Sequence, residues 1–217
     1  MRRMNKNLLN VLVALSAIAA MTSQRLGQEF VFSILKPLTT ILVISVVWFY
    51  SCKNSKNTIL VFLGLIACLA GDILLLDEAR FAYGLASFLL AHLVFSFVLF
   101  NLSKGELRYF PLVILLFVGA GFYYFLYPEL GELAIPVAVY LCCISTMCWL
   151  GINLYLLRPS PASNLLCIAG LLFVFSDAII AVNKFLLPFS LSQVVILTTY
   201  WLSISLIANA FTMKQLQ

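Results

Sequence analysis

The sequence predicts an all-α membrane protein, a bundle of eight transmembrane helices, and two observations predict this class. First, 64% of the 217 residues are hydrophobic and 10% are charged, whereas a soluble domain has about 45–50% apolar and about 25% charged residues. Second, apolar residues form unbroken runs of helical length, for example residues 59–76 and 81–100. A membrane β-barrel would instead show segments of about ten residues with alternating polarity. Because backbone groups in lipid must bond within their own segment, these runs are expected to span the bilayer as helices.

The apolar runs place eight spans along the chain, separated by short connections. They are expected at residues 8–22, 34–51, 58–77, 80–100, 109–127, 133–156, 165–182 and 189–212. No connection is long enough to separate domains, so residues 1–217 are expected to form a single transmembrane domain. The basic start and the apolar run after it are similar to a secretory signal peptide. We expect this first span to be retained, because the next segments are also spans.

The positive charges predict the orientation of the bundle. Lys and Arg are enriched in cytoplasmic loops, and in this chain they divide nine to four between the two sides. The majority side holds Arg2, Arg3, Lys6, Lys53, Lys56, Lys104, Arg108, Arg158 and Lys214, and the minority side holds Arg25, Lys36, Arg80 and Lys184. Both termini are therefore expected in the cytoplasm, and the expected location is the inner (cell) membrane of a bacterium.

The composition argues against several other kinds of site. The net charge of +5 comes from residues at helix ends, which indicates membrane orientation and no nucleic-acid partner. The six cysteines form no CxxC pair and are expected to be small packing residues. A single histidine, His92, excludes a zinc site built on several histidines. We therefore expect no metal and no cofactor.

The two halves of the chain are similar around a pair of acidic residues. Residues 64–76 read GLIACLAGDILLL and residues 170–182 read GLLFVFSDAIIAV, which places Asp72 and Asp177 at matching positions. In the next helices His92 aligns with Tyr200. This pattern predicts two parallel repeats, 1–108 and 109–217, about an axis along the membrane normal. Chance similarity between two leucine-rich helices is the alternative.

Asp72 and Asp177 are the candidate catalytic residues. Acidic residues inside a span are costly and usually face the bundle interior or a wet cavity. At 1.5 Å per residue, Asp72 lies roughly 8 Å below the outer surface, and Asp177 lies at a similar depth. Two nearby carboxyl groups can divide the work of a protonated acid and an ionised base. The alternative is that each Asp only forms a hydrogen bond to a neighbouring helix.

Five further residues are candidates for substrate binding. His92 lies near the middle of its span, and Tyr200 is the residue that aligns with it in the second repeat. Each is expected either to contact the substrate or to pack in the buried interior. Lys36, which is expected to open the second span next to Pro37, and Lys184 are cations near the outer surface that can bind an anionic headgroup or extend to the interface. Asn183 is an interfacial polar candidate. These residues are read directly from the sequence.

At these positions the sequence resembles the YhhN family of lysoplasmalogenases. The matching blocks are Lys36-Pro37-Leu38-Thr39, Gly71-Asp72-Ile73-Leu74-Leu75, Gly84 through Phe88 to Ala91-His92, Tyr140 with Met147-Cys148-Trp149, Gly170 to Phe173 with Ser176-Asp177, and Thr199-Tyr200. The resemblance covers nearly the whole chain. It implies an eight-span protein in which Asp72 and Asp177 occupy the two acidic positions of the family.

The resemblance also implies a reaction, the cleavage of the vinyl ether bond of a lysoplasmalogen to a fatty aldehyde and a glycerophospho-alcohol. Two carboxyl groups suit this reaction, since it passes through an oxocarbenium ion like that of glycosidases. The expected partners are a lysophospholipid substrate and membrane lipids, and the sequence does not define an oligomeric state. A proton-coupled transporter and a lipid-binding protein without turnover are the alternative functions.

Overall fold

The computed structural model describes residues 5–52 and 55–214, and within these ranges the secondary structure is entirely helical. Seven helical stretches are long and apolar enough to cross a membrane. The helices are α1 Lys6–Arg25, α2 Glu29–Tyr50, α3 Lys56–Leu74, α4 Phe81–Leu102, α5 Phe110–Leu130, α6 Ala134–Leu157, α7 Pro161–Ala181 and α8 Ser192–Ala210. The predicted all-α, multi-pass membrane class is therefore confirmed.

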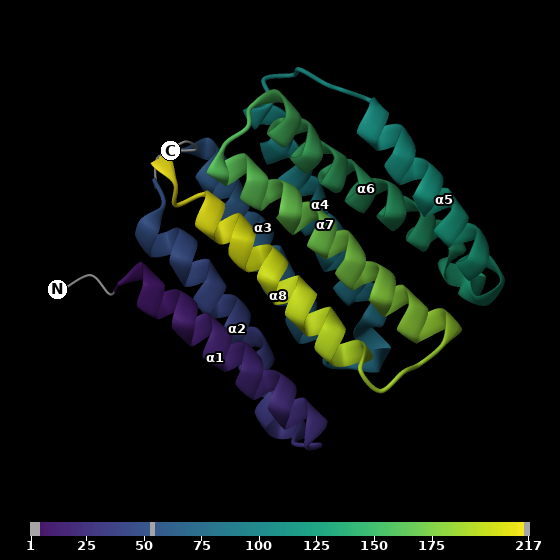
Figure 1. The fold of residues 1–217 in the computed structure, drawn as a ribbon. Helices are drawn as coiled ribbons and strands as arrows, with labels where there is room; N and C mark the ends of the chain where they lie inside the picture. Colours follow the sequence, from purple (N-terminus) through teal and green to yellow (C-terminus); the bar gives the residue numbers. More distant parts are fainter. Residues whose placement is uncertain (1–4, 53–54, 215–217) are drawn as a thin grey trace.

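The longest of the seven stretches, Phe110–Leu157, contains both α5 and α6. A 3₁₀ turn, Gly131–Leu133, joins the two helices without a break. Gly131 has a φ of +52°, a conformation that glycine adopts at little cost. The chain reverses at this turn, so that α5 and α6 lie side by side (Figure 1).

The second helix begins earlier than the sequence predicted. The prediction placed Lys36 and Pro37 at the start of a span at residue 34, whereas α2 begins at Glu29 and contains Pro37 in its interior. Glu29 lies in the first turn, where its charge interacts favourably with the helix dipole. A proline is tolerated inside a membrane helix because neighbouring groups compensate for its missing N–H. The consequence is that Lys36 points into the bundle and is 7% exposed.

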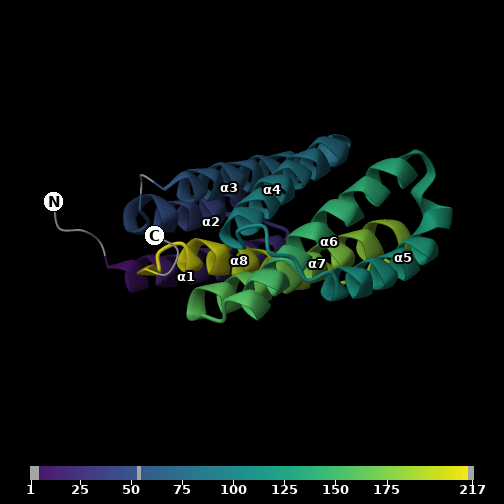
Figure 2. The ribbon, with the colours of Figure 1, turned by 90° about the horizontal axis from the view of Figure 1, so that it is seen from above.

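The helices pack so that α2, α3, α4, α6, α7 and α8 surround a common interior. The pairs α3–α4, α6–α7 and α7–α8 make extensive contacts, while α4 also packs on α6 and α2 packs on α8. In contrast, α1 and α5 lie at opposite edges of the bundle (Figures 1 and 2). Gly71 allows close approach within the interior, because a Cβ at this position would lie 2.6 Å from the Phe88 ring.

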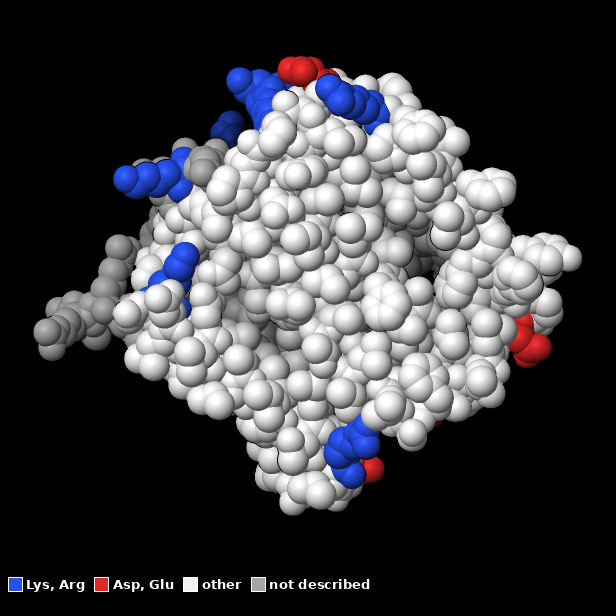
Figure 3. All heavy atoms as spheres, in the orientation of Figure 1, with Lys and Arg blue, Asp and Glu red and all other residues white. Residues whose placement is uncertain are grey.

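Both described ends of the chain lie at one end of the bundle. The Lys6 ammonium donates a hydrogen bond of 3.0 Å to Thr212 Oγ1, and Asn10 bonds with Asn209. Arg2, Arg3 and Lys53, which contributed to the predicted orientation, lie outside the described residues. Figure 3 shows a broad face without charged side chains, with Lys, Arg, Asp and Glu confined to its rim. This distribution is the one that a bilayer requires.

Candidate active site

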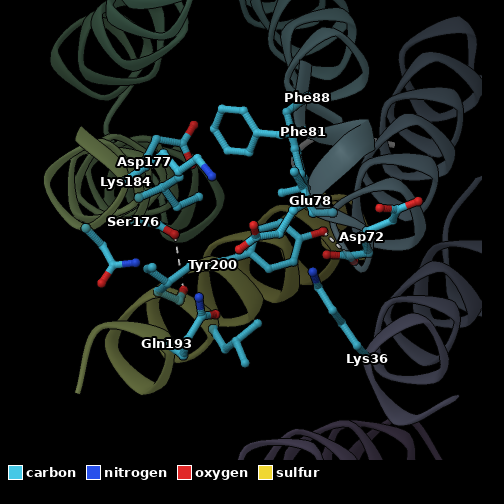
Figure 4. A pocket seen from close by; sticks show the side chains of 16 residues that line it. Lys36, Asp72, Glu78, Phe81, Phe88, Ser176, Asp177, Lys184, Gln193 and Tyr200 are labelled. Atoms are coloured by element: carbon cyan, nitrogen blue, oxygen red, sulfur yellow. Dashed lines mark hydrogen bonds between the residues drawn. The ribbon is translucent and has the colours of Figure 1, made fainter. Parts of the chain in front are cut away.

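Asp72 lies in the last turn of α3 and is held by hydroxyl groups from two other helices. Thr40 Oγ1 of α2 and the Tyr200 hydroxyl of α8 both donate to Asp72 Oδ2, at 2.5 and 2.8 Å. The Trp201 indole donates in turn to Thr40 Oγ1 at 3.3 Å, which orients this hydroxyl. The Asp72 residue is only 1% exposed. The carboxyl group is therefore fixed in position by a chain of hydrogen bonds (Figure 4).

Asp177 lies near the end of α7 and is contacted by α6 and α4. The Tyr140 hydroxyl donates to Asp177 Oδ2 at 2.5 Å. His92 Nε2 lies 3.8 Å from the same oxygen. The imidazole is fully buried, and within the described part of the chain neither of its ring nitrogens has a hydrogen-bond partner. Its ring packs edge-on against Phe173 and Tyr140, at centroid distances of 4.6 and 5.3 Å.

The two carboxyl groups have corresponding surroundings. Asp72, in the first half of the chain, is contacted by Thr40 from its own half and by Tyr200 from the second half. Asp177, in the second half, is contacted by Tyr140 from its own half and by His92 from the first. Each acid thus accepts a hydrogen bond from a hydroxyl on the preceding helix. Each also lies next to a polar ring on the last helix of the opposite half.

Asp72 and Asp177 line one cavity, which we call the carboxylate cavity, with a volume of about 170 Å³. Figure 4 shows the two acids on opposite sides of it, with Tyr200 and Phe88 on its walls. Asp77, Glu78, Lys184 and Gln193 also line it. Since these residues belong to the ends and connections of α3, α4, α7 and α8 that lie opposite the chain termini, the cavity faces that end of the bundle.

Most of the predicted substrate-binding residues lie at this cavity. Lys36, Tyr200, Asn183 and Lys184 line it, while His92 is buried behind Asp177 and does not. The Lys184 ammonium lies 5.3 Å from the centre of the Phe81 ring. Asn183 Oδ1 accepts a hydrogen bond of 3.3 Å from the Phe189 amide, so this side chain also holds the α7–α8 connection.

The sequence did not identify Thr40 and Tyr140 as partners of the two acids, or Trp201 as the partner of Thr40. Thr40 and Trp201 carry no sequence signal beyond being polar side chains within a span, whereas Tyr140 lies in one of the blocks that resemble the YhhN family. Over residues 5–52 and 55–214, no three His, Cys, Asp or Glu side chains cluster where they could hold a metal ion. The groups that line the cavity include four carboxyl groups, the Tyr200 hydroxyl and two ammonium groups, and this set can transfer protons and bind an anion.

Comparison with known proteins identifies the family. The model for the YhhN family matches residues 31–211. Lysoplasmalogenase TMEM86A from Bos taurus is 32% identical over 155 residues, which cover 68% of this chain and 63% of that protein. The Homo sapiens TMEM86A is 30% identical over 154 residues, with the same shares of the two chains.

Lysoplasmalogenase TMEM86B from Rattus norvegicus is 32% identical over 142 residues, which cover 64% of this chain and 55% of that protein. The matched segments thus span less than two thirds of the length of these relatives. No solved structure is significantly similar to this chain. Because the family match extends over most of the sequence, from α2 to the end of α8, this chain belongs to the YhhN family.

Proposed function

We propose that this protein is an intramembrane hydrolase that cleaves the vinyl ether bond of lysoplasmalogens, releasing a fatty aldehyde and a glycerophospho-alcohol. The observation that carries the proposal is the meeting of Asp72 and Asp177, from two different helices, at one cavity near a bundle end. The names of the three relatives support the substrate class. Acidic residues that are buried at a cavity inside a membrane bundle are typical of a functional site.

The reaction needs one acid and one base. A proton is first added to the vinyl carbon that carries the alkyl chain, which gives an oxocarbenium ion at the carbon next to oxygen. Water then attacks that carbon and loses a proton to the base, forming a hemiacetal. The hemiacetal hydroxyl then gives its proton to the deprotonated acid, and the glycerol oxygen takes the proton held by the base as its bond to the former vinyl carbon breaks. The products are the aldehyde and the alcohol. One water is consumed overall, and the two carboxyl groups return to their starting states.

The surroundings of the two acids support a different role for each. Asp72 Oδ2 accepts two hydroxyl hydrogen bonds, and the Lys36 ammonium points into the same side of the cavity (Figure 4). Hydrogen-bond donors and a nearby cation stabilise an ionised carboxylate, so Asp72 is the base. Asp177 accepts one hydroxyl bond, and apolar side chains such as Leu85 and Ile180 line the small cavity beside it. Asp177 is therefore the acid that protonates the double bond.

Lys36 is the proposed binding site for the substrate phosphate. It lines both the carboxylate cavity and a wider surface hollow of about 640 Å³ between the α1–α2 turn and the α3–α4 connection. Gln24, Glu29 and Ser33 also line this hollow. A lysolipid headgroup in the hollow would place its phosphate near Lys36 and its vinyl ether between the two acids.

A topology of eight spans with both termini in the cytoplasm is part of the proposal. The lengths of α5 and α6, 21 and 24 residues, support counting them as two spans. The shared position of the chain ends supports an even number of crossings. In this topology the carboxylate cavity faces the outer side of a bacterial inner membrane. The corresponding contacts of Asp72 and Asp177 support the predicted repeats 1–108 and 109–217.

Hydrolysis in heavy water tests the function directly. Purified protein in lipid nanodiscs would be incubated with a lysoplasmalogen in D₂O, and the products would be examined by mass spectrometry. The expected result is an aldehyde with one deuterium on the carbon next to the carbonyl, because that carbon receives the solvent proton. In H₂¹⁸O, the glycerol product should keep its original oxygen, since water attacks the vinyl carbon.

Other outcomes of this assay would overturn the proposal. Saturable binding of lysoplasmalogen without aldehyde would indicate a lipid-binding protein. Proton-dependent uptake into liposomes without cleavage would indicate a transporter. Release of a fatty acid would indicate an esterase acting on a different lipid class.

Replacement of Lys36 should weaken substrate binding more than it slows the chemical step. We expect Lys36→Met to raise the KM for a lysoplasmalogen about tenfold or more, because a hydrogen bond to a charged group contributes about 1.5–3 kcal/mol. A 1-alkenyl glycerol without phosphate should show nearly the same KM with both proteins. The matched control is Lys56→Met, at the opposite end of the bundle. Equal increases in KM for both substrates would show that Lys36 does not bind phosphate.

A further inference from the structure

A second, apolar cavity lies between α5, α6 and α7, and we call it the apolar slot. Its volume is about 240 Å³, and its walls include Leu115, Val118, Phe122, Val137, Ile144 and Val174. Figure 3 shows a hollow on the right of the visible face, where Figure 1 places the space between α7 and α5. The proposed chemistry at the carboxylate cavity makes no use of this slot.

The apolar slot reaches the acid of the proposed reaction. Asp177 lines both the slot and the carboxylate cavity, and Tyr140, which donates to Asp177, also lines the slot. A small cavity of about 50 Å³ shares Asp177, Tyr140 and Val137 with the slot and shares Phe81 and Phe88 with the carboxylate cavity. The two spaces therefore meet at Asp177, one with charged and polar groups among apolar ones and the other with almost entirely apolar walls.

The slot has the direction and length of a lipid chain in one leaflet. Leu115 and Leu126, both on its wall, are eleven residues apart on α5, which is about 16 Å at 1.5 Å per residue. Half of a hydrocarbon core of about 30 Å is about 15 Å. In the proposed topology α5 runs from its inner end at Phe110 to its outer end at Leu130, so the slot extends from the level of Asp177 toward the middle of the bilayer.

The position of α5 gives the slot access from the lipid. α5 lies at the edge of the bundle and packs mainly on α6 and on the turn Val182–Leu186 after α7. Val118 on its wall is 62% exposed. A single-chain lipid can therefore reach the slot from the side without crossing the bundle interior.

We propose that the apolar slot binds the 1-alkenyl chain of the substrate, an assignment that rests on the proposed function. The headgroup then lies in the surface hollow beside Lys36, and the vinyl ether lies in the carboxylate cavity at Asp177, where this cavity meets the slot. The carbon that carries the chain faces Asp177, which donates the proton, and the carbon next to oxygen faces the Asp72 side, from which water attacks. The slot thus selects the chain and fixes which vinyl carbon meets the acid.

Filling the slot tests the assignment by its effect on chain-length preference. Val118→Phe and Val174→Phe each place a larger side chain on the wall, from α5 and α7 respectively. Val113→Phe is the matched control, since Val113 lies on the same helix as Val118, is 63% exposed and does not line the slot. The ligands are non-cleavable 1-O-alkyl analogues with one shared phosphoethanolamine headgroup and either a long or a short chain, and their Kd values are measured in nanodiscs.

We expect Val118→Phe and Val174→Phe to weaken binding of the long-chain analogue about tenfold or more. This follows because each methylene excluded from an apolar site costs about 0.8 kcal/mol, or roughly a factor of four. Binding of the short-chain analogue should change less than about twofold. The ratio of the two Kd values should stay unchanged in Val113→Phe.

The two levels of the proposal fail in different ways. An unchanged ratio of Kd values in both Val118→Phe and Val174→Phe would overturn the slot assignment, whether or not the wild-type protein releases aldehyde. Absence of aldehyde from the wild-type protein, together with the expected shift in the ratio, would overturn the hydrolase function and leave a chain-binding site. Aldehyde release by all variants with the long-chain rate selectively reduced would support both.

Discussion

Aldehyde release by Asp177→Asn should be about 10²–10⁴-fold slower than by the wild-type protein, because a positioned general acid typically contributes this much. An asparagine keeps the shape of the side chain and can still accept the hydrogen bond from Tyr140 that Asp177 Oδ2 accepts at 2.5 Å. It cannot supply a proton to the vinyl carbon. The loss should therefore appear in kcat, with little change in the KM of the lysoplasmalogen.

The matched control for this variant is Glu132→Gln, which makes the same change of group at an exposed position in the α5–α6 turn. Both variants should unfold at temperatures close to that of the wild type, as measured by intrinsic fluorescence. Turnover by Asp177→Asn within about tenfold of the wild-type rate would contradict the assigned role, since a general acid is worth more than this.

The fold class could be predicted because the bilayer imposes it. A chain with 64% hydrophobic residues in runs of helical length has few alternatives in lipid. The start of α2 could not be placed, because Pro37 is a strong signal for a helix start in water and a weak one in a membrane. The described helix begins at Glu29, eight residues before this proline.

That the two acids lie at one level of the bundle could be predicted, but their partners could not. Counting residues along a span gives depth, so Asp72 and Asp177 were expected at one level, and both line the carboxylate cavity. Which helices adjoin each acid depends on packing between distant segments, such as α2 with α8. The hydrogen bonds of Thr40 and Tyr140 follow from that packing and leave no periodic signal in the sequence.

The position of His92 illustrates the same limit. The sequence places it near the middle of a span and leaves its direction open between a substrate contact and a packed interior. In the structure its ring lies between Phe173 and Tyr140, with Nε2 3.8 Å from Asp177. Its contact with the substrate would therefore be indirect, through Asp177. Whether His92 faces the cavity or the packed interior depends on how α4 is rotated about its own axis. The sequence does not reveal this rotation, because α4 is apolar on all sides.

The second large effect is expected for Asp72→Asn, whose aldehyde release should also be about 10²–10⁴-fold slower. The reason differs from that of Asp177→Asn. Asp177 can still protonate the double bond, but the oxocarbenium ion then lacks the base that activates water and the charge that stabilises it. The ion should return to Asp177 one of the two hydrogens on its chain-bearing carbon as a proton and regenerate the substrate.

Recovered substrate distinguishes the two acids. In D₂O, unreacted lysoplasmalogen from Asp72→Asn should contain deuterium at the vinyl carbon that carries the chain, whereas substrate from Asp177→Asn should contain none. The control is Glu106→Gln, which replaces an exposed carboxylate paired with Arg158 at the opposite end of the bundle. Its rate of aldehyde release should match that of the wild type. Deuterium in the substrate from Asp177→Asn, and none from Asp72→Asn, would exchange the two roles. The deuterium label reports proton transfer to the vinyl carbon separately from water attack. It therefore tests the roles of acid for Asp177 and base for Asp72 that the hydrogen bonds of Tyr140, Thr40 and Tyr200 support.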